Sequence, residues 1–402
     1  AVTAIVFAAA VIALVRALIR GEAYCSGKLN RFIPRRVSLV ISTFLVAGFL
    51  LFVVNGVLAE KLLHAADSFF AQLDEMIEEG VEQPKISTVS GSAASLIEWD
   101  SIGRRGKNFV VGAATQEELT EFLGREAQKP LRVYVGLRSR PSAQLRAGLA
   151  LAERKRVGGF ARSVRVVATP TGTGWLDPSA VDALEYLHAG DTAIVSVQYS
   201  YLPSWLTILV DPDLSRETAH VLFDEIYDYW TTLPPEGRPQ LYLFGLSLGA
   251  LGCEEAADLM TVFEDPIQGA LWSGPPFPST QWADITRNRN AGTPSWLPEY
   301  RDSSMVRFTG QRNALNNGRR WGPIRNVYIQ YASDPMTFFS PDLLFHKPDW
   351  LGGGRGPDVS PHLRWYPFIT VLQIGFGLPL ATTPPHGYGH SISPANNNDA
   401  GI

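Results

Sequence analysis

From residue 131 onward, short apolar runs alternate with amphipathic helical stretches, and this alternation limits the chain to a few folds. The runs expected to form strands are LRVYVGL (131–137), SVRVVATP (163–170), TAIVSVQYS (192–200), QLYLFG (240–245), IQGALWSG (267–274) and NVYIQYAS (326–333). Strands that are apolar throughout belong to a parallel sheet covered by helices on both faces. The sequence therefore predicts a doubly wound α/β domain with a mostly parallel sheet over residues 131–402.

The run at 240–245 leads directly into a predicted helix through the motif G-x-S-x-G, formed by Gly245, Ser247 and Gly249. A strand-to-helix turn of this kind is so tight that side chains at both glycine positions would collide with neighbouring backbone. The serine takes strained dihedral angles, and its hydroxyl projects above the carboxyl end of the sheet. Ser247 is thus a candidate nucleophile; the alternative is an ordinary serine in a glycine-rich turn.

A nucleophilic serine needs an acid and a histidine, which follow it in that order in this type of fold. Asp334 comes directly after the last predicted strand, although it could simply start an Asp-Pro turn. His390 lies in the late loop TTPPHGYGHSI, with His386 as the alternative. The prolines and glycines of this loop argue against a helical zinc pair, and no third ligand is evident. We therefore expect neither a metal nor an organic cofactor.

The oxyanion hole of such a site combines two backbone N–H groups. One belongs to the residue after the nucleophile, Leu248. The other is expected in the loop after an earlier strand, where VVATPTGTGW places Thr171, Gly172 and Thr173. This loop could also be an ordinary glycine turn.

Residues 275–326 form an arginine-rich insertion between two predicted strands. They contain eight arginines and three tryptophans against only three acids. An insertion here lies over the carboxyl edge of the sheet, where ligands bind. Arginine suits phosphate, and tryptophan suits a membrane interface. We expect a lid that recognises anionic lipid headgroups, with candidate residues Arg287, Arg289, Arg319 and Arg320; the alternative is a solvated basic loop.

The first 60 residues contain two apolar runs, residues 1–19 and 37–59, each long enough to cross a bilayer. The chain opens inside the first run, so we expect a fragment of a longer protein. The loop between the runs is basic, whereas residues 60–85 hold seven acids and two lysines. The positive-inside rule then places everything after residue 59 outside the cytoplasm. Residues 61–130 are expected to form an amphipathic helix followed by a linker or strap.

The net charge of −4 gives no indication of a nucleic-acid partner. The motifs TPTGTGW, QYSYLPS, GLSLG and GYGH instead resemble those of bacterial membrane-anchored α/β-hydrolases, and the resemblance covers most of the chain. It implies a multi-pass protein of the bacterial inner membrane with a serine-hydrolase domain. Enzymes of similar build cleave aminoacyl esters from phosphatidylglycerol. Family members often have GHGH where this chain has GYGH, which favours His390 over His386.

The resemblance also implies that residues 365–382 supply the last helix and strand before the histidine. The expected function is a serine esterase acting on a lipid or aminoacyl-phospholipid, with membrane lipids as partners. An acyltransferase with the same triad and an inactive membrane scaffold are the alternatives. The sequence does not fix the oligomeric state.

Overall fold

The computed structural model describes residues 20, 24, 27–28, 59–257, 264–316, 319–352 and 354–392. The chain divides into two compact units, Ala1–Phe70 and Ala71–Ile402. Apart from residue 59, both apolar runs predicted to span a membrane lie outside the described residues, so that interpretation stays a prediction. In the described part of the chain, no helix is both long enough and apolar enough to cross a bilayer.

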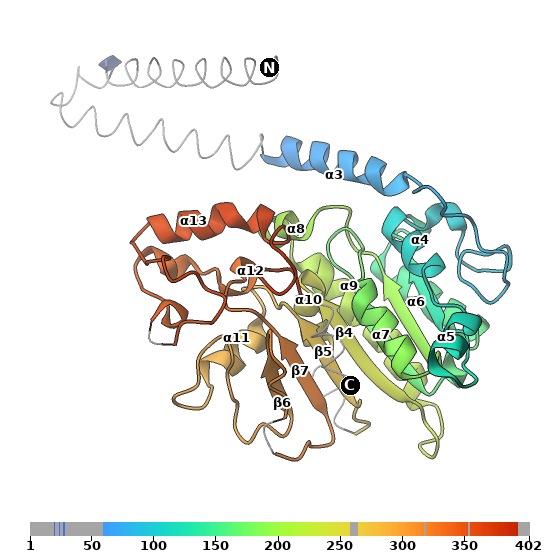
Figure 1. Ribbon diagram of the computed structural model, residues 1–402. Helices are drawn as coiled ribbons and strands as arrows, with labels where there is room; N and C mark the ends of the chain where they lie inside the picture. Colours follow the sequence, from blue (N-terminus) through green and yellow to red (C-terminus); the bar gives the residue numbers. More distant parts are fainter. Residues whose placement is uncertain are drawn as a thin grey trace. The chain divides into compact units, whose positions relative to one another are not determined.

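The larger unit is built on a parallel sheet of seven strands in the order β1-β3-β2-β4-β5-β7-β6 (Figure 1). The strands are β1 (Leu131–Val135), β2 (Val164–Thr169), β3 (Thr192–Val197), β4 (Gln240–Leu246), β5 (Gly269–Ser273), β6 (Val306–Thr309) and β7 (Arg325–Ile329). Every neighbouring pair is parallel. The predicted parallel α/β architecture is confirmed, and β4 is its middle strand.

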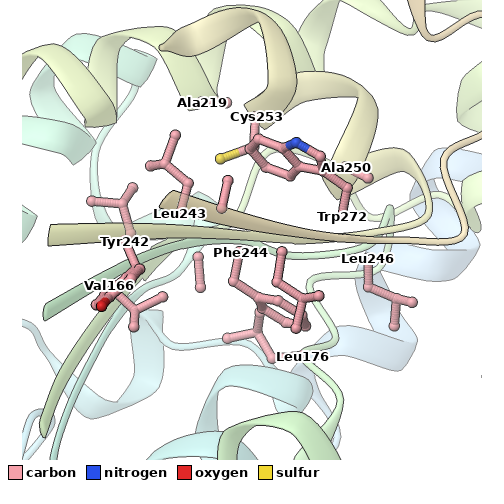
Figure 2. Close-up of a cluster of buried hydrophobic side chains, with 14 of the residues drawn as sticks. Val166, Leu176, Ala219, Tyr242, Leu243, Phe244, Leu246, Ala250, Cys253 and Trp272 are labelled. Carbon is pink, nitrogen blue, oxygen red and sulfur yellow. The ribbon is translucent and has the colours of Figure 1, made fainter. Parts of the chain in front are cut away.

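Helices cover both faces of this sheet, as the apolar strands require. From α4 onward, the helices of the larger unit are α4 (Arg104–Val111), α5 (Gln116–Leu123), α6 (Ala143–Arg156), α7 (Pro178–Leu187), α8 (Ser204–Val210), α9 (Asp213–Thr231), α10 (Leu248–Ala256), α11 (Thr280–Arg287), α12 (Pro335–Phe338) and α13 (Ile369–Gly377). Figure 2 shows Leu243 of β4 on the side of α9 and α10, and Phe244 and Leu246 on the opposite side. All three side chains are buried, so β4 is apolar on both faces.

Local signals explain where several of these helices begin. Thr115 and Glu118 form a capping box at the start of α5, with each side chain bound to the other residue's backbone N–H. Asp177 caps α7 through the backbone N–H of Ser179, and Pro178 follows at the first helical position. Such caps satisfy N–H groups that a helix start leaves unbonded.

The region predicted as helix and linker, residues 61–130, contains more structure than expected. Its first helix is α3 (Ala59–Glu75). Beyond it, a short 3-10 turn at Trp99–Ser101 precedes α4 and α5. Ile97 and Ile102 are buried, and the Arg132 guanidinium of β1 donates to the Phe109 carbonyl oxygen of α4. Residues 95–123 therefore belong to the packed fold rather than to a linker.

The end of the chain also differs from expectation. Residues 365–382 form α13 and a 3-10 turn (Leu378–Leu380), and no strand is found there. One of the two edge strands of the sheet is β6, which lies within the arginine-rich segment 275–326 together with α11. Part of the predicted lid is thus a component of the sheet. Its expected role as a lid that recognises anionic lipid headgroups stays a prediction.

Candidate active site

Ser247 stands at the carboxyl end of the middle strand, between β4 and α10. Its backbone has φ 56° and ψ −124°, a positive-φ conformation that an L-residue adopts only under strain. Its N–H donates to the Ser273 carbonyl oxygen at the end of β5, over 2.8 Å. The neighbouring strand therefore holds the strained turn in place.

The two glycines that flank Ser247 have no room for a side chain. A Cβ atom on Gly245 would lie 2.6 Å from the backbone N and Cα of Ala250, and one on Gly249 would lie 2.1 Å from the Thr169 carbonyl oxygen. Both obstacles are backbone atoms, which cannot rotate away. The close approach at Gly249 also brings the end of β2 directly against the elbow.

Asp334 follows β7 and is buried. Its Oδ1 accepts the N–H groups of Met336 at 2.8 Å and Thr337 at 3.4 Å, so it caps α12. Its Oδ2 accepts the Thr337 hydroxyl at 3.0 Å. The residue therefore does start a turn, as the alternative reading proposed. Its second carboxylate oxygen is nevertheless available to a further partner.

That further partner is His390. Its Nδ1 lies 2.7 Å from Asp334 Oδ2, and both side chains are buried. With Nδ1–H donating to the carboxylate, Nε2 is the basic nitrogen of the ring. His386, the alternative, is exposed, and its Nδ1 lies 3.2 Å from the Ser391 hydroxyl. Of the two histidines, the structure brings only His390 to the predicted acid.

The histidine ring and the elbow meet at the end of β5. Ser273 accepts the Ser247 N–H, and a Cβ on the next residue, Gly274, would lie 2.8 Å from His390 Cε1. Both Ser247 Oγ and His390 Nε2 are buried, and neither has a hydrogen-bond partner among the described residues. A serine and base that are not yet hydrogen-bonded are common in ligand-free sites.

A brace joins the histidine loop to the aspartate turn. The Gly389 N–H donates to Ser333 Oγ at 2.9 Å, and that hydroxyl donates to Asp358 Oδ2 at 2.5 Å. The Ser333 N–H reaches the same carboxylate oxygen at 2.9 Å. Because Ser333 precedes Asp334 and Gly389 precedes His390, this brace fixes the two ends of the His–Asp hydrogen bond. The sequence offered no signal for Ser333, Asp358 or Gly274.

The predicted oxyanion loop begins beside the elbow, but two of its N–H groups are engaged. The Thr171 N–H donates to the Trp175 carbonyl oxygen at 2.9 Å, and the Gly172 N–H donates to Ser204 Oγ at 2.9 Å. Leu248 is the first residue of α10, where backbone N–H groups lack helical partners. Thr173 is the third candidate. The choice of loop donor stays a prediction.

The motifs TPTGTGW and QYSYLPS contact each other in this loop. The Tyr199 hydroxyl donates to the Pro170 carbonyl oxygen at 3.0 Å, while Ser204 accepts from Gly172. A Cβ on Gly172 would lie 2.4 Å from the Leu202 carbonyl oxygen. The second motif therefore shapes the loop that the first one forms.

Three of the four candidate arginines have partners elsewhere in the chain. Arg287 pairs with Asp284 at 2.8 Å, and Arg319 donates to the Arg301 carbonyl oxygen at 3.2 Å. Arg289 binds two carbonyl oxygens and the Asp349 carboxylate. Arg320 is exposed. These contacts shape the segment 275–326, and a role in ligand recognition remains a prediction.

A cavity of about 770 Å³ lies behind the histidine loop. Its lining includes Arg312, Arg355, His386, Tyr388 and Trp296. The Arg355 guanidinium is bound to the carbonyl oxygens of residues 360 and 363. Among the described residues, no group of three His, Cys, Asp or Glu side chains could hold a metal ion.

A middle strand that ends in a strained serine, followed in the chain by a paired aspartate and histidine, defines the α/β-hydrolase class. A family model described as "Alpha/beta-hydrolase family" matches residues 131–399, and its companion, "Alpha/beta-hydrolase family N-terminus", matches residues 1–113. The chain belongs to this family.

Other comparisons are more distant. An iodinated complex of acetyl xylan esterase has 14% identity and a TM-score of 0.22, covering 44% of this chain and 85% of that one. A structure from the study of LipS and LipT, two metagenome-derived lipolytic enzymes, has 14% identity and a TM-score of 0.22, covering 42% and 84%. No curated protein matches the chain significantly. Family membership is therefore what classifies this protein.

Proposed function

We propose that this protein is a serine hydrolase that cleaves an ester by covalent catalysis, with Ser247 as nucleophile. The observation that carries the proposal is the buried His390–Asp334 pair, 2.7 Å apart, beside a strained serine elbow. Ser247 Oγ and His390 Nε2 are both buried, and neither has a hydrogen-bond partner among the described residues. Buried polar groups without partners are rare in folded proteins, and at such a site they are available for chemistry.

In the proposed mechanism, His390 Nε2 takes the hydroxyl proton as Ser247 Oγ attacks the ester carbonyl carbon. The backbone N–H of Leu248 and one from the 171–173 loop stabilise the oxyanion. The protonated His390 then gives its proton to the leaving alcohol, and an acyl-enzyme remains. A water molecule, deprotonated by His390, attacks that acyl group and releases Ser247. Asp334 orients the imidazole and stabilises its charged form.

We further propose that the ester belongs to a lipid, including an aminoacyl-phospholipid, and that the catalytic domain lies outside the cytoplasm of a bacterial cell. The N-terminal apolar runs and the acidic stretch that follows them support a membrane-anchored arrangement. The exposed Arg320 and Arg312, in the segment 275–326, are available for an anionic headgroup.

The test is labelling with a fluorophosphonate, which reacts covalently with activated serines. Wild-type protein should be labelled, and Ser247→Ala should not. His390→Ala should lose both labelling and about 10⁶-fold in hydrolysis, as for other triads. His386→Ala is the matched control and should retain both. A folded wild-type protein that resists labelling would sink the proposal and favour an inactive scaffold. Transfer of the acyl group to an added alcohol would instead indicate an acyltransferase.

A further inference from the structure

Two helices beside the candidate site turn large apolar side chains outward. The six on α8, α13 and the residues that flank α13 are each 53–79% exposed: Leu209, Phe368, Ile369, Leu372, Phe376 and Leu380. We refer to these six as the α8–α13 face. Single exposed apolar residues are normal, but a group of this size marks an interaction surface.

α13 is apolar on both of its sides. Inward, Ile374 packs against the main core, and Leu378 is buried just beyond the helix. Outward, Ile369, Leu372 and Phe376 follow the i, i+3, i+7 spacing of one helical face. The sequence has no Asp, Glu, Lys or Arg from residue 365 to residue 392. The exposed Gln373 is the polar side chain of this outward side. A helix surface that is otherwise apolar is typical of a core or of contact with lipid, so the outward side of α13 calls for an apolar partner.

This face borders the candidate active site. Ile208 of α8 and Leu378 belong to one buried cluster, which also contains Leu248, the residue after the nucleophile. Figure 1 shows α8 and α13 at the same edge of the molecule. The chain then runs from α13 into the histidine loop, where the Ala381 carbonyl oxygen accepts the His390 N–H at 2.9 Å.

We propose that the α8–α13 face docks on the surface of a lipid bilayer. Phe345 and Phe368 form an edge-to-face pair, with ring centroids 5.6 Å apart, and both are exposed. Exposed Tyr366, Lys347 and Arg364 lie close to this pair in the sequence. Apolar side chains bordered by an amphipathic aromatic residue and cations suit the boundary between acyl chains and anionic headgroups.

The chain itself favours this partner over others. Its two N-terminal apolar runs are long enough to cross a bilayer. A protein anchored by them would hold the α8–α13 face where a membrane is the apolar partner at hand. Docking would also let a lipid ester pass from the bilayer to the carboxyl edge of the sheet without first entering water. That last step rests on the proposed function, whereas docking itself does not.

The first experiment places an environment-sensitive fluorophore on the full chain by Phe376→Cys, in a Cys25→Ser background that leaves only the buried Cys253. Phe122→Cys is the matched control, because Phe122 is also a phenylalanine, is 72% exposed and lies on α5. Each protein is reconstituted into vesicles of phosphatidylcholine with and without phosphatidylglycerol. The Phe376 probe should shift to the blue and be quenched by spin-labelled lipid, and the Phe122 probe should do neither.

Three outcomes would overturn the proposal. A Phe376 probe that remains in water shows that the α8–α13 face contacts neither the bilayer nor any other partner. A blue shift without quenching by lipid shows that a segment of the chain itself covers it. A shift that depends on the protein-to-lipid ratio shows that a second copy covers it.

Turnover gives an independent readout. Phe376→Asp should lower hydrolysis of a phospholipid ester in vesicles about tenfold, since burial of one large side chain contributes that much. Hydrolysis of a soluble short-chain ester should not change, and Phe122→Asp should affect neither. Equal losses on both substrates would contradict docking. The Ser247→Ala protein should still show the Phe376 shift, so failure of the catalytic proposal and failure of docking are separable.

Discussion

Replacing Gly274 by alanine should displace the His390 ring although none of the proposed triad residues is itself substituted. The new Cβ would lie 2.8 Å from His390 Cε1 and 3.2 Å from Nδ1. Ordinary contacts of this kind begin at 3.4 Å, so the ring must move by at least about half an ångström. Misplacing a catalytic group by about 1 Å costs about 100-fold in rate. We expect kcat for ester hydrolysis to fall between about tenfold and about 100-fold, with little change in KM.

The same substitution also strains the backbone, because Gly274 has φ +56°. An alanine in that conformation costs about 1–2 kcal/mol of folding free energy. Gly292→Ala separates the two effects. Gly292 has φ +87°, and a Cβ there would meet nothing within 4 Å. Both variants should therefore lose similar stability in urea denaturation, but only Gly274→Ala should lose activity.

Purified full-length proteins would be compared for kcat on a soluble ester and for fluorophosphonate labelling rate. A wild-type kcat in folded Gly274→Ala would refute the placement of His390 beside β5. An equal loss of kcat in both variants would show that backbone strain, rather than contact with the imidazole, is responsible.

Two further predictions concern buried polar groups. Burial raises the pKa of Glu254 to about 8, from 4.5, so the folded protein holds a proton that the unfolded chain releases. The folding free energy that this proton contributes is fully present below the unfolded pKa of Glu254 and is lost as pH rises through its folded pKa. Urea denaturation at a series of pH values should show this decline in the wild type but not in Glu254→Gln. Ser333→Ala removes the acceptor of the Gly389 N–H and should lower kcat about tenfold through a misaligned His390, while Ser333→Thr, which keeps a hydroxyl, should recover part of it. A change in KM alone would argue against the brace.

Six of the seven strands could be predicted from sequence because each lies in a predominantly apolar run. β6 was missed because it spans only four residues, Val306–Thr309, in a polar part of the sequence. The Arg307 guanidinium donates to the carbonyl oxygens of residues 303, 315 and 319, and it stacks over Trp321 at 3.8 Å. Hydrogen bonds to the flanking loops thus satisfy a charged side chain within this strand. No local pattern predicts them.

The candidate site likewise contains residues that a local sequence pattern identifies and others that only contacts between distant segments define. Ser247 and Asp334 could be found because each closely follows an apolar run of the sequence, whatever the number of residues between them. Ser333 and Asp358 act through contacts between segments, and their sequence neighbourhoods look like ordinary turns. The predicted oxyanion loop begins beside the elbow, but only the structure reveals that Ser204 holds the Gly172 N–H.

The four parts of the candidate site are not held equally well. β4, β5 and β7 are hydrogen-bonded neighbours, so the sheet itself fixes Ser247, Gly274 and Asp334 at one edge. His390 has no strand beneath it. Its position depends on its own N–H to Ala381, on the Gly389 N–H to Ser333 and on the ring's bond to Asp334. Ala381 lies just beyond the 3-10 turn Leu378–Leu380, outside the sheet. The proposed base therefore depends on loop contacts, whereas the proposed nucleophile and acid depend on the sheet.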